Sequence, residues 1–121
     1  MFKNIINQIK EEQPSLLVVG DLMLDKYIFG DVERISPEAP VPVVTLKNEE
    51  QMLGGCGNVI RNLNNLGVGI SIISAVGTDS VGDSIKGKLS GMGIPISNIL
   101  SIEDTRTTEK MRIVANKQQI A

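Results

Sequence analysis

The sequence predicts an α/β fold in one small domain. Short apolar runs and amphipathic helical patterns follow one another in the order strand, extended segment, helix, strand, helix, strand. The chain has 121 residues, of which 41% are hydrophobic, and this is enough for one domain with its own core. Because only 2% of the residues are aromatic, we expect a core of isoleucine, valine, leucine and methionine.

The chain opens with an amphipathic helix and a short strand. In residues 1–12 apolar side chains recur at helical spacing between polar ones, so we expect a surface helix that packs one stripe inward. Pro14 ends this helix. The unbroken apolar run 16–19, closed by Gly20, is typical of a buried parallel strand.

Two other segments are predicted to be extended. Residues 37–42 include three prolines, which exclude a helix and favour edge strands or an extended flap within 27–53. From 107 to 115 the side chains alternate in character, which is the period of a strand. A turn at 103–105 precedes this last strand.

The middle of the chain predicts two helices and two strands. Helical periodicity over 58–66 stops at Gly67, where a C-terminal glycine cap is expected, and the apolar run 70–76 predicts a second buried strand. Asp79 is most simply the N-cap of the next helix, and 98–102 is a further expected strand. The buried face of that helix is marked by Val81, Ile85, Leu89 and Met92.

Composition excludes several classes of function. A net charge of −2, no dense basic run and few aromatics argue against nucleic-acid binding and favour a small polar metabolite as the ligand. The single cysteine, Cys56, and the absence of histidine leave no disulfide and no zinc site, so we expect no metal site and a reducing cytoplasm. No apolar run approaches the roughly 18 residues of a membrane span, so we expect a soluble protein with no membrane partner.

The most distinctive motif is the small-residue turn 54–58, Gly-Gly-Cys-Gly-Asn, directly before a helix. Glycine allows a ligand to approach the backbone closely, and the free N–H groups of a first helical turn favour an anionic or oxygen-rich ligand. The same glycines also suit a plain strand-to-helix turn. Both interpretations stay open on the spacing alone.

Polar side chains follow the first strand and the glycine turn. Asp21 and Asp25 lie where ligands bind in open α/β sheets, beyond the carboxyl ends of the strands, and their carboxylates can accept hydrogen bonds from sugar hydroxyls. The alternatives are a turn cap for Asp21 and an ion pair with Lys26 for Asp25. Asn58 suits a vicinal diol, or is an ordinary residue of the first helical turn.

Three basic residues lie on segments predicted to be extended, namely Arg34, Lys110 and Arg112. If the extended segment folds over the ligand, these side chains can bind a phosphate, and arginine can do so with two hydrogen bonds. Taken singly, each is more simply explained as a solvated strand residue than as a phosphate ligand. Only their common placement favours the phosphate-binding interpretation.

These motifs carry a resemblance to a known family. Residues 20–27, 34–43 and 54–58 resemble the opening of bacterial heptose-7-phosphate kinases, which are ribokinase-like (phosphofructokinase-B) sugar kinases. Residues 76–82 resemble that family's second turn, and 116–119 resemble its Asn-x-Gln-Gln-like stretch loosely. The resemblance runs from about residue 16 to the last residue.

The resemblance implies a fold and a reaction. The fold would be the N-terminal part of a Rossmann-type three-layer sandwich with a β-sheet lid, formed by segments of about 27–53 and 98–115, which often makes a dimer. The reaction would be ATP- and Mg²⁺-dependent phosphorylation of D-glycero-β-D-manno-heptose 7-phosphate at the anomeric hydroxyl. This step belongs to ADP-heptose synthesis for lipopolysaccharide, often in a protein fused to an adenylyltransferase.

The family's sugar-binding residues can be carried over by position. The aspartate falls on Asp25, the paired glycines on Gly54 and Gly55, and the amide on Asn58, while Lys110 and Arg112 become candidates for the 7-phosphate. Cys56 departs from the alanine or glycine that is usual in the family's turn. A small thiol preserves the turn but can alter the pocket slightly.

The family's catalytic motif, Gly-x-Gly-Asp, is not in this sequence, and neither is a Walker-type phosphate loop. We therefore expect no catalytic residue, nucleotide site or metal site in this chain, and a sugar-binding half that is inactive alone and either oligomeric or marginally stable. The main alternative is a non-catalytic module for sugar-phosphate binding or dimerisation. A Rossmann-type oxidoreductase is a distant third, since Gly20 does not begin Gly-x-Gly-x-x-Gly.

Overall fold

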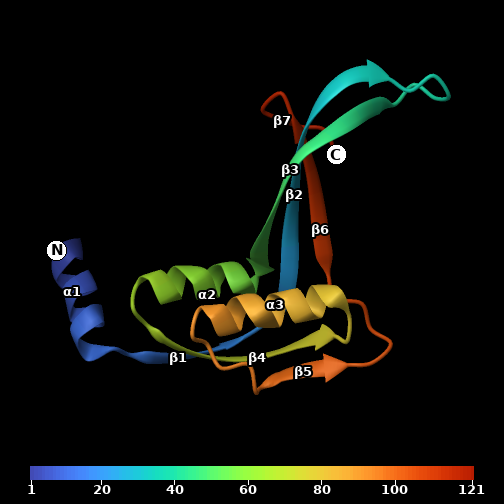
Figure 1. The fold of residues 1–121 in the computed structure, drawn as a ribbon. Coiled ribbons are helices and arrows are strands. Elements are labelled where there is room, and N and C mark those ends of the chain that lie inside the picture. The colour runs from blue at the N-terminus through green and yellow to red at the C-terminus, as the bar shows by residue number, and fades with distance from the viewer. The chain divides into compact units, whose positions relative to one another are not determined.

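The computed structural model describes the backbone of residues 1–121 and every side chain except that of Glu33. The chain forms two compact units, which are Met1–Leu24 with Leu53–Thr108 (unit 1) and Asp25–Met52 with Glu109–Ala121 (unit 2). The elements in chain order (Figure 1) are α1 (Phe2–Glu12), β1 (Ser15–Val19), β2 (Leu22–Ile35), β3 (Pro42–Gly55), α2 (Cys56–Asn65), β4 (Gly69–Gly77), α3 (Ser80–Gly91), β5 (Ile99–Ile102), β6 (Glu109–Ala115) and β7 (Gln118–Gln119).

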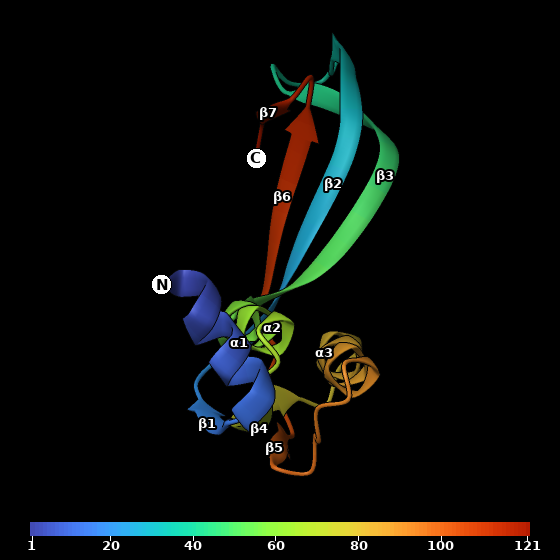
Figure 2. The same cartoon turned by 90° about the vertical axis from the view of Figure 1, so that its left-hand side faces the viewer.

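Unit 1 is built on a three-stranded parallel sheet in the order β1-β4-β5. Residues 15–19 pair with 69–73, and residues 74–77 pair with 99–102. The helices α2 and α3 lie on the same face of this sheet in both views (Figures 1 and 2). Helix α3 joins β4 to β5, the crossover that parallel neighbours need, so the predicted α/β class is confirmed.

The core of unit 1 lies between this face and the two helices. Its most deeply buried side chains are at most 1% exposed, and they are Leu24, Ile60, Ile72, Ile85 and Leu89. They are aliphatic, as the composition predicts. The helix ends are also as expected, with left-handed glycines after each helix at Gly67 (φ 83°) and Gly93 (φ 79°).

The prediction that 16–19 forms a buried strand is wrong in one respect. The strand is present and parallel, but Leu17 is 59% exposed and Val19 is 68% exposed. Both share a face of the sheet with Ile73, Leu100 and Ile102, which are also exposed. The helices α2 and α3 lie on the other face of the sheet (Figures 1 and 2). The apolar run therefore predicts the strand correctly, but it does not show whether one face or both faces of the sheet are covered by helices.

Helix α1 forms where expected but does not pack its apolar stripe inward. It contains no buried residue, and Phe2 is 77% exposed. Gln13, in the left-handed conformation, caps the helix by donating its N–H to the carbonyl oxygen of Ile9 at 3.0 Å. Helical periodicity therefore predicts that this helix forms, but no other part of unit 1 buries its apolar side chains in the structure.

Unit 2 is a four-stranded sheet in the order β3-β2-β6-β7, in which β6 and β7 pair antiparallel while β2 and β6 run in the same direction (Figures 1 and 2). The prolines lie in the 36–41 connection and at the start of β3, where the N–H of Ser36 donates to the carbonyl oxygen of Val41 at 2.8 Å. They exclude a helix as predicted. Gly30 allows β3 to approach, because a Cβ there would overlap the carbonyl oxygen of Thr45.

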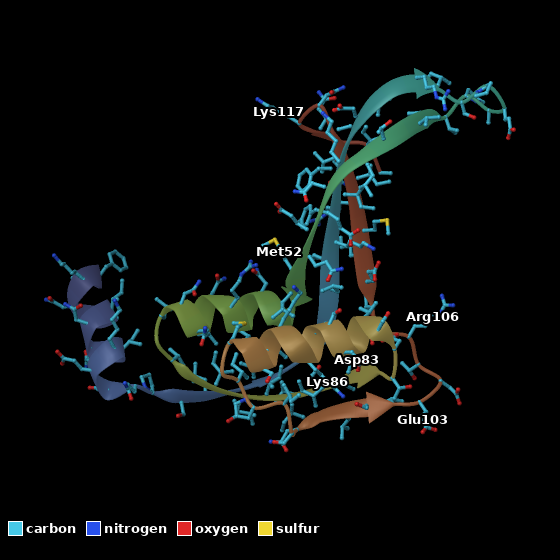
Figure 3. The ribbon with its side chains drawn as sticks, viewed as in Figure 1. Met52, Asp83, Lys86, Glu103, Arg106 and Lys117 are labelled. Atoms are coloured by element: carbon cyan, nitrogen blue, oxygen red, sulfur yellow. The ribbon has the colours of Figure 1, made fainter. Side chains whose placement is uncertain are left out.

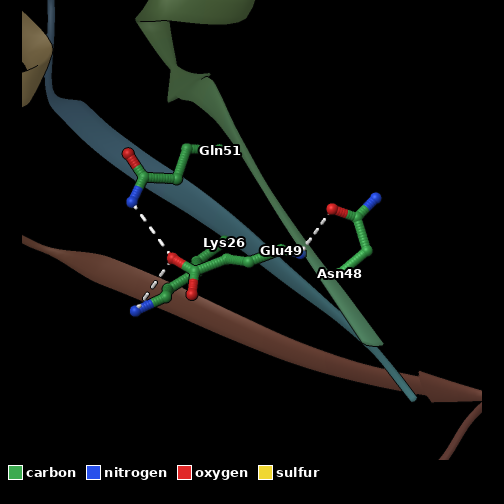
Figure 4. A network of polar contacts seen from close by, with 4 residues as sticks. All are labelled: Lys26, Asn48, Glu49 and Gln51. Carbon is green, nitrogen blue, oxygen red and sulfur yellow. Dashed lines mark hydrogen bonds and ion pairs between the residues drawn. The ribbon is translucent and has the colours of Figure 1, made fainter. Parts of the chain in front are cut away.

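Charged pairs link β2 and β3 across the sheet. Lys26 pairs with Glu49 at 3.2 Å (Figure 4), and Asp31 pairs with Lys47 at 2.6 Å. The carboxylate of Glu49 also accepts a hydrogen bond from Gln51 at 3.3 Å. These pairs lie on a partly exposed surface, so each contributes little to stability but helps to fix the strand register.

The expected lid segments fall on elements of both units. Of 98–115, residues 99–102 form β5 of the parallel sheet, while 109–115 form β6 of the second sheet. The 27–53 segment covers most of β2 and β3. Among the helices of the described chain, none has both the length and the apolar character needed to cross a bilayer.

Two neighbouring isoleucines of β4 test which face of the sheet is covered. Ile72 is 1% exposed and Ile73 is 43% exposed. Ile72→Ala should cost about 2–5 kcal/mol of unfolding free energy because it leaves a cavity, whereas Ile73→Ala should cost about 1 kcal/mol or less, both measured by urea denaturation. Equal losses would show that the second face is also covered in solution.

Candidate functional site

A pocket of about 210 Å³ lies in unit 1, at the carboxyl ends of β4 and β5 and just after β1. Its walls include Asp21 and Met23 from the segment after β1, Gly77 from the end of β4, and residues 105–108 from the connection between β5 and β6. In parallel α/β sheets this edge is where ligands bind. The structure therefore brings Asp21, one of the predicted site residues, to a cavity of the expected kind.

The glycine turn is closed by the segment that contains Asp21. Gly55 has φ 60° and is the N-cap of α2, and a Cβ there would lie 2.5 Å from the carbonyl oxygen of Asp21. The N–H of Cys56 donates to the same oxygen at 2.9 Å. Helix α2 thus starts at Cys56, two residues earlier than predicted, and Gly55 is required both by its conformation and by this close approach.

The Cys56 thiol is half-buried in this turn. Burial, followed by the negative charge of Asp21, raises the pKa of the thiol. The thiol is therefore protonated and unreactive at neutral pH, which agrees with its expected role as a small packing residue in place of alanine or glycine.

Asp25 lies on β2 in unit 2 and is half-buried. Its Oδ1 is fully buried and has no hydrogen-bond partner among the described side chains and backbone. The alternative of an ion pair with Lys26 is wrong, because Lys26 pairs with Glu49. A buried carboxylate oxygen without a partner is costly, and such groups in native proteins are frequently functional.

The other sugar-binding candidates lie at the start of α2. Gly54 is buried and Gly55 is exposed, and the side chain of Asn58 is exposed at the helix surface. The Oδ1 of Asn58 accepts a hydrogen bond from Arg61 at 2.6 Å, a pairing one helical turn away that the sequence analysis missed. A ligand that uses this oxygen has to compete with Arg61.

The three basic candidates all lie on strands of unit 2. Arg34 and Lys110 are exposed. Arg112 donates to the hydroxyl of Tyr27 at 2.7 Å, and its guanidinium lies 5.5 Å from the centre of the Tyr27 ring. The tyrosine thus holds this guanidinium in a defined orientation. None of the three is among the residues that line the pocket of unit 1.

Arg106 is a pocket residue that the sequence analysis did not select. It lies on the connection between β5 and β6 (Figure 3) and lines the pocket together with Thr105 and Thr108. Its position after a strand of a parallel sheet was the available signal, since that is also the position that singled out Asp21.

Asp79 does more than the predicted capping. Its Oδ1 accepts the N–H of Gly82 at 2.8 Å, as an N-cap should, and also accepts the hydroxyl of Thr107 at 2.6 Å. Its Oδ2 accepts the N–H of Thr107 at 2.8 Å. The bonds to Thr107, then the bond to Gly82, lower the pKa of Asp79 to about 2, so this carboxylate stabilises the fold above pH 4 and loses the effect as the pH falls towards 2.

Gly55 and Gly87 provide a matched test of the turn. Gly55→Ala should lower the unfolding free energy by more than about 1 kcal/mol, because alanine disfavours φ 60° and would overlap Asp21. Gly87→Ala, inside α3 with nothing within 4 Å of the new Cβ, should raise it by about 0.5–1 kcal/mol. Denaturant titration measures both, and a Gly55→Ala protein as stable as the parent would refute the described turn.

Two proteins of known sequence are similar to this chain over most of its length. Bifunctional protein HldE of Aliarcobacter butzleri is 45% identical over 109 residues, which are 90% of this chain and 23% of the relative. Bifunctional protein HldE of Campylobacter concisus is 50% identical over 105 residues, which are 87% of this chain and 22% of the relative. The chain thus spans under a quarter of the length of these relatives.

Solved sugar-kinase structures share the fold. Arabidopsis thaliana ribokinase, complexed with ribose and ATP, superposes with a TM-score of 0.68 at 20% identity, over 89% of this chain and 34% of that chain. Ribokinase from Cryptococcus neoformans, in complex with ADP, gives a TM-score of 0.63 at 18% identity, over 88% and 33%. The model of the pfkB family carbohydrate kinases matches residues 13–121. The fold is therefore a ribokinase-like α/β fold, and the chain belongs to the pfkB family of carbohydrate kinases.

Proposed function

We propose that this chain is the sugar-binding part of an ATP-dependent kinase that phosphorylates D-glycero-β-D-manno-heptose 7-phosphate at the anomeric hydroxyl. The observation that carries the proposal is the buried Oδ1 of Asp25, which has no partner among the described residues. A sugar hydroxyl is a donor of the right kind for this oxygen, and a hydrogen bond to a charged acceptor is stronger than one between neutral groups. We propose a heptose as the sugar because residues 20–27 and 54–58 resemble the corresponding motifs of heptose-7-phosphate kinases.

The glycine turn and the segment after β1 complete the proposed sugar contacts. Gly54 and Gly55 carry no side chain, so they are proposed to offer the sugar their backbone, although the Cβ direction of Gly55 is taken by the carbonyl oxygen of Asp21. Asn58 offers a donor and an acceptor to a diol once its bond to Arg61 is exchanged. The Asp21 carboxylate, exposed at the pocket of unit 1, is a further acceptor for hydroxyl groups.

Basic side chains are the proposed partners of the 7-phosphate. Lys110 and Arg34 are exposed and can reorient towards an anion, while Arg112 is held by Tyr27 and can present its remaining N–H donors in a fixed direction. Arg106 joins them as a candidate because it lines the pocket. An arginine that is already oriented loses less conformational entropy when it binds a phosphate.

The sheet of unit 2 is the part that we propose as a lid over the sugar and as the contact of a homodimer. Its strands carry exposed apolar side chains, among them Leu46 at 59% and Met111 at 47% exposure. Such residues are suited to a contact between copies of the chain. We also propose that the kinase acts in the cytoplasm, because ATP and sugar phosphates are available there.

ATP and Mg²⁺ are proposed as cofactors of the whole kinase. Among the described side chains, no group of three or more histidine, cysteine, aspartate or glutamate residues is arranged to hold a metal ion. We therefore assign no metal-dependent or nucleotide-dependent step to the described residues. Their proposed work is to bind and orient the sugar, with the 121-residue chain inactive as a kinase by itself.

Binding of heptose 7-phosphate to the purified chain, measured by titration calorimetry, tests the proposal. Asp25→Asn should weaken binding by about tenfold or more, because one charged hydrogen-bond acceptor is lost. Its melting temperature should stay near the parent value, since Oδ1 has no protein partner to lose. The control is Asp31→Asn on the same strand, whose carboxylate pairs with Lys47 and whose affinity should change less than about twofold.

Two results would count against the proposed site. An Asp25→Asn protein that binds the sugar phosphate like the parent would remove Asp25 from the site. Heptose-dependent ATP consumption by the purified chain would show that it is not merely the sugar-binding part.

A further inference from the structure

The side chains of Asp79 and Thr107 join three segments at the carboxyl edge of the parallel sheet. Asp79 is the N-cap of α3, Thr107 lies on the connection between β5 and β6, and Gly77 ends β4. The Thr107 hydroxyl donates to Asp79 at 2.6 Å and accepts the N–H of Gly77 at 2.8 Å. Thr107 is only 8% exposed; its bond with Gly77 is buried, and its bond with Asp79 is partly buried.

Two glycines allow the segments to approach this closely. A Cβ on Gly77 would overlap the carbonyl oxygen of Thr105, and a Cβ on Gly82 would overlap the carbonyl oxygen of Gly77. The close approach of these segments therefore depends on glycine at both positions. The carboxylate of Asp79 lies beside Gly82, where its Oδ1 would be 3.1 Å from a Cβ. This carboxylate accepts three hydrogen bonds, of which only the one from Gly82 belongs to the helix cap; the other two come from Thr107.

The segment held by these bonds reaches both the pocket and the strand that carries Asp25. Thr105, Arg106 and Thr108, the neighbours of Thr107, all line the pocket. The carbonyl oxygen of Thr108 accepts the N–H of Leu24 at 3.0 Å, and Leu24 is 1% exposed and directly precedes Asp25 in the chain. Both residues of this bond belong to unit 1, and each is the last residue before the chain passes into unit 2.

We infer that Asp79 and Thr107 are positioning residues of the sugar site. Their hydrogen bonds fix segment 105–108, and through the bond between Thr108 and Leu24 they fix the backbone from which Asp25 extends. The inference rests on the proposed function in so far as the site binds a sugar. Neither residue is assigned a direct contact with the sugar, since the Thr107 hydroxyl proton is already donated to Asp79.

Variants can separate the cap of α3 from the bonds to Thr107. Asp79→Ser keeps a residue that caps helices well but lacks the second oxygen that accepts the Thr107 N–H. Thr107→Val keeps the shape of the side chain and removes the hydroxyl, and Thr107→Ser keeps the hydroxyl as the matched conservative control. If Asp79→Ser does not fold, Asp79→Asn retains the cap and also lacks the second acceptor.

The test combines amide hydrogen exchange of the chain with calorimetric titration of heptose 7-phosphate. In Asp79→Ser and Thr107→Val, the amides of Leu24 and of residue 107 should exchange about tenfold faster, while those of Val18 and Ile73, in the paired segments of β1 and β4, stay protected. Affinity for the sugar phosphate should fall about fivefold or more in both and return close to the parent value in Thr107→Ser.

The results test two claims separately, namely the positioning role of Asp79 and Thr107 and the binding of the sugar phosphate. Unchanged exchange at Leu24 would overturn the inference. Faster exchange at Leu24 without a loss of affinity would also overturn it, and so would uniformly faster exchange that includes Ile73. A parent chain that does not bind the sugar phosphate would contradict the proposed function, and exchange at Leu24 would then still decide whether the bonds to Thr107 hold this backbone.

Discussion

The hydrogen bonds between Asp79 and Thr107 connect residues that are 28 positions apart in the sequence. A parallel sheet places the carboxyl ends of its strands at one edge, but each strand there is followed by a connection of its own. The ionised carboxylate of Asp79 ties one such connection to the start of α3, in a place where Gly77 and Gly82 let the backbones meet. The pocket walls and the base of β2 depend on where that connection lies.

The elements of unit 1 follow from the sequence because each has a local signature. The helix after Cys56, the strand 70–76 and the helix that begins at Ser80 all form from their apolar periodicity and their capping residues. What periodicity does not reveal is the surface that packs against an element. The exposed side chains of Leu17 and Phe2 show this, since an apolar run or stripe predicts a strand or helix without identifying its cover.

The candidate site was predictable to the extent that strand ends and turns determine it. Asp21 and Gly55 were singled out from their positions, and the structure brings them into contact through the Asp21 carbonyl oxygen. The bonds of Asn58 with Arg61 and of Arg112 with Tyr27 were not predictable, because side-chain pairs depend on rotamers and on strand register. These pairings distinguish the candidates whose polar atoms are occupied from Asp25, whose Oδ1 is not.

The central claim is that the unpartnered carboxylate oxygen of Asp25 binds a sugar hydroxyl. A crystal structure of the chain with D-glycero-β-D-manno-heptose 7-phosphate bound tests it most directly. The account predicts a sugar hydroxyl at about 2.7 Å from Oδ1 of Asp25, the usual length of a bond from a hydroxyl to a carboxylate. A sugar phosphate bound elsewhere, with this oxygen still lacking a partner, would contradict the account.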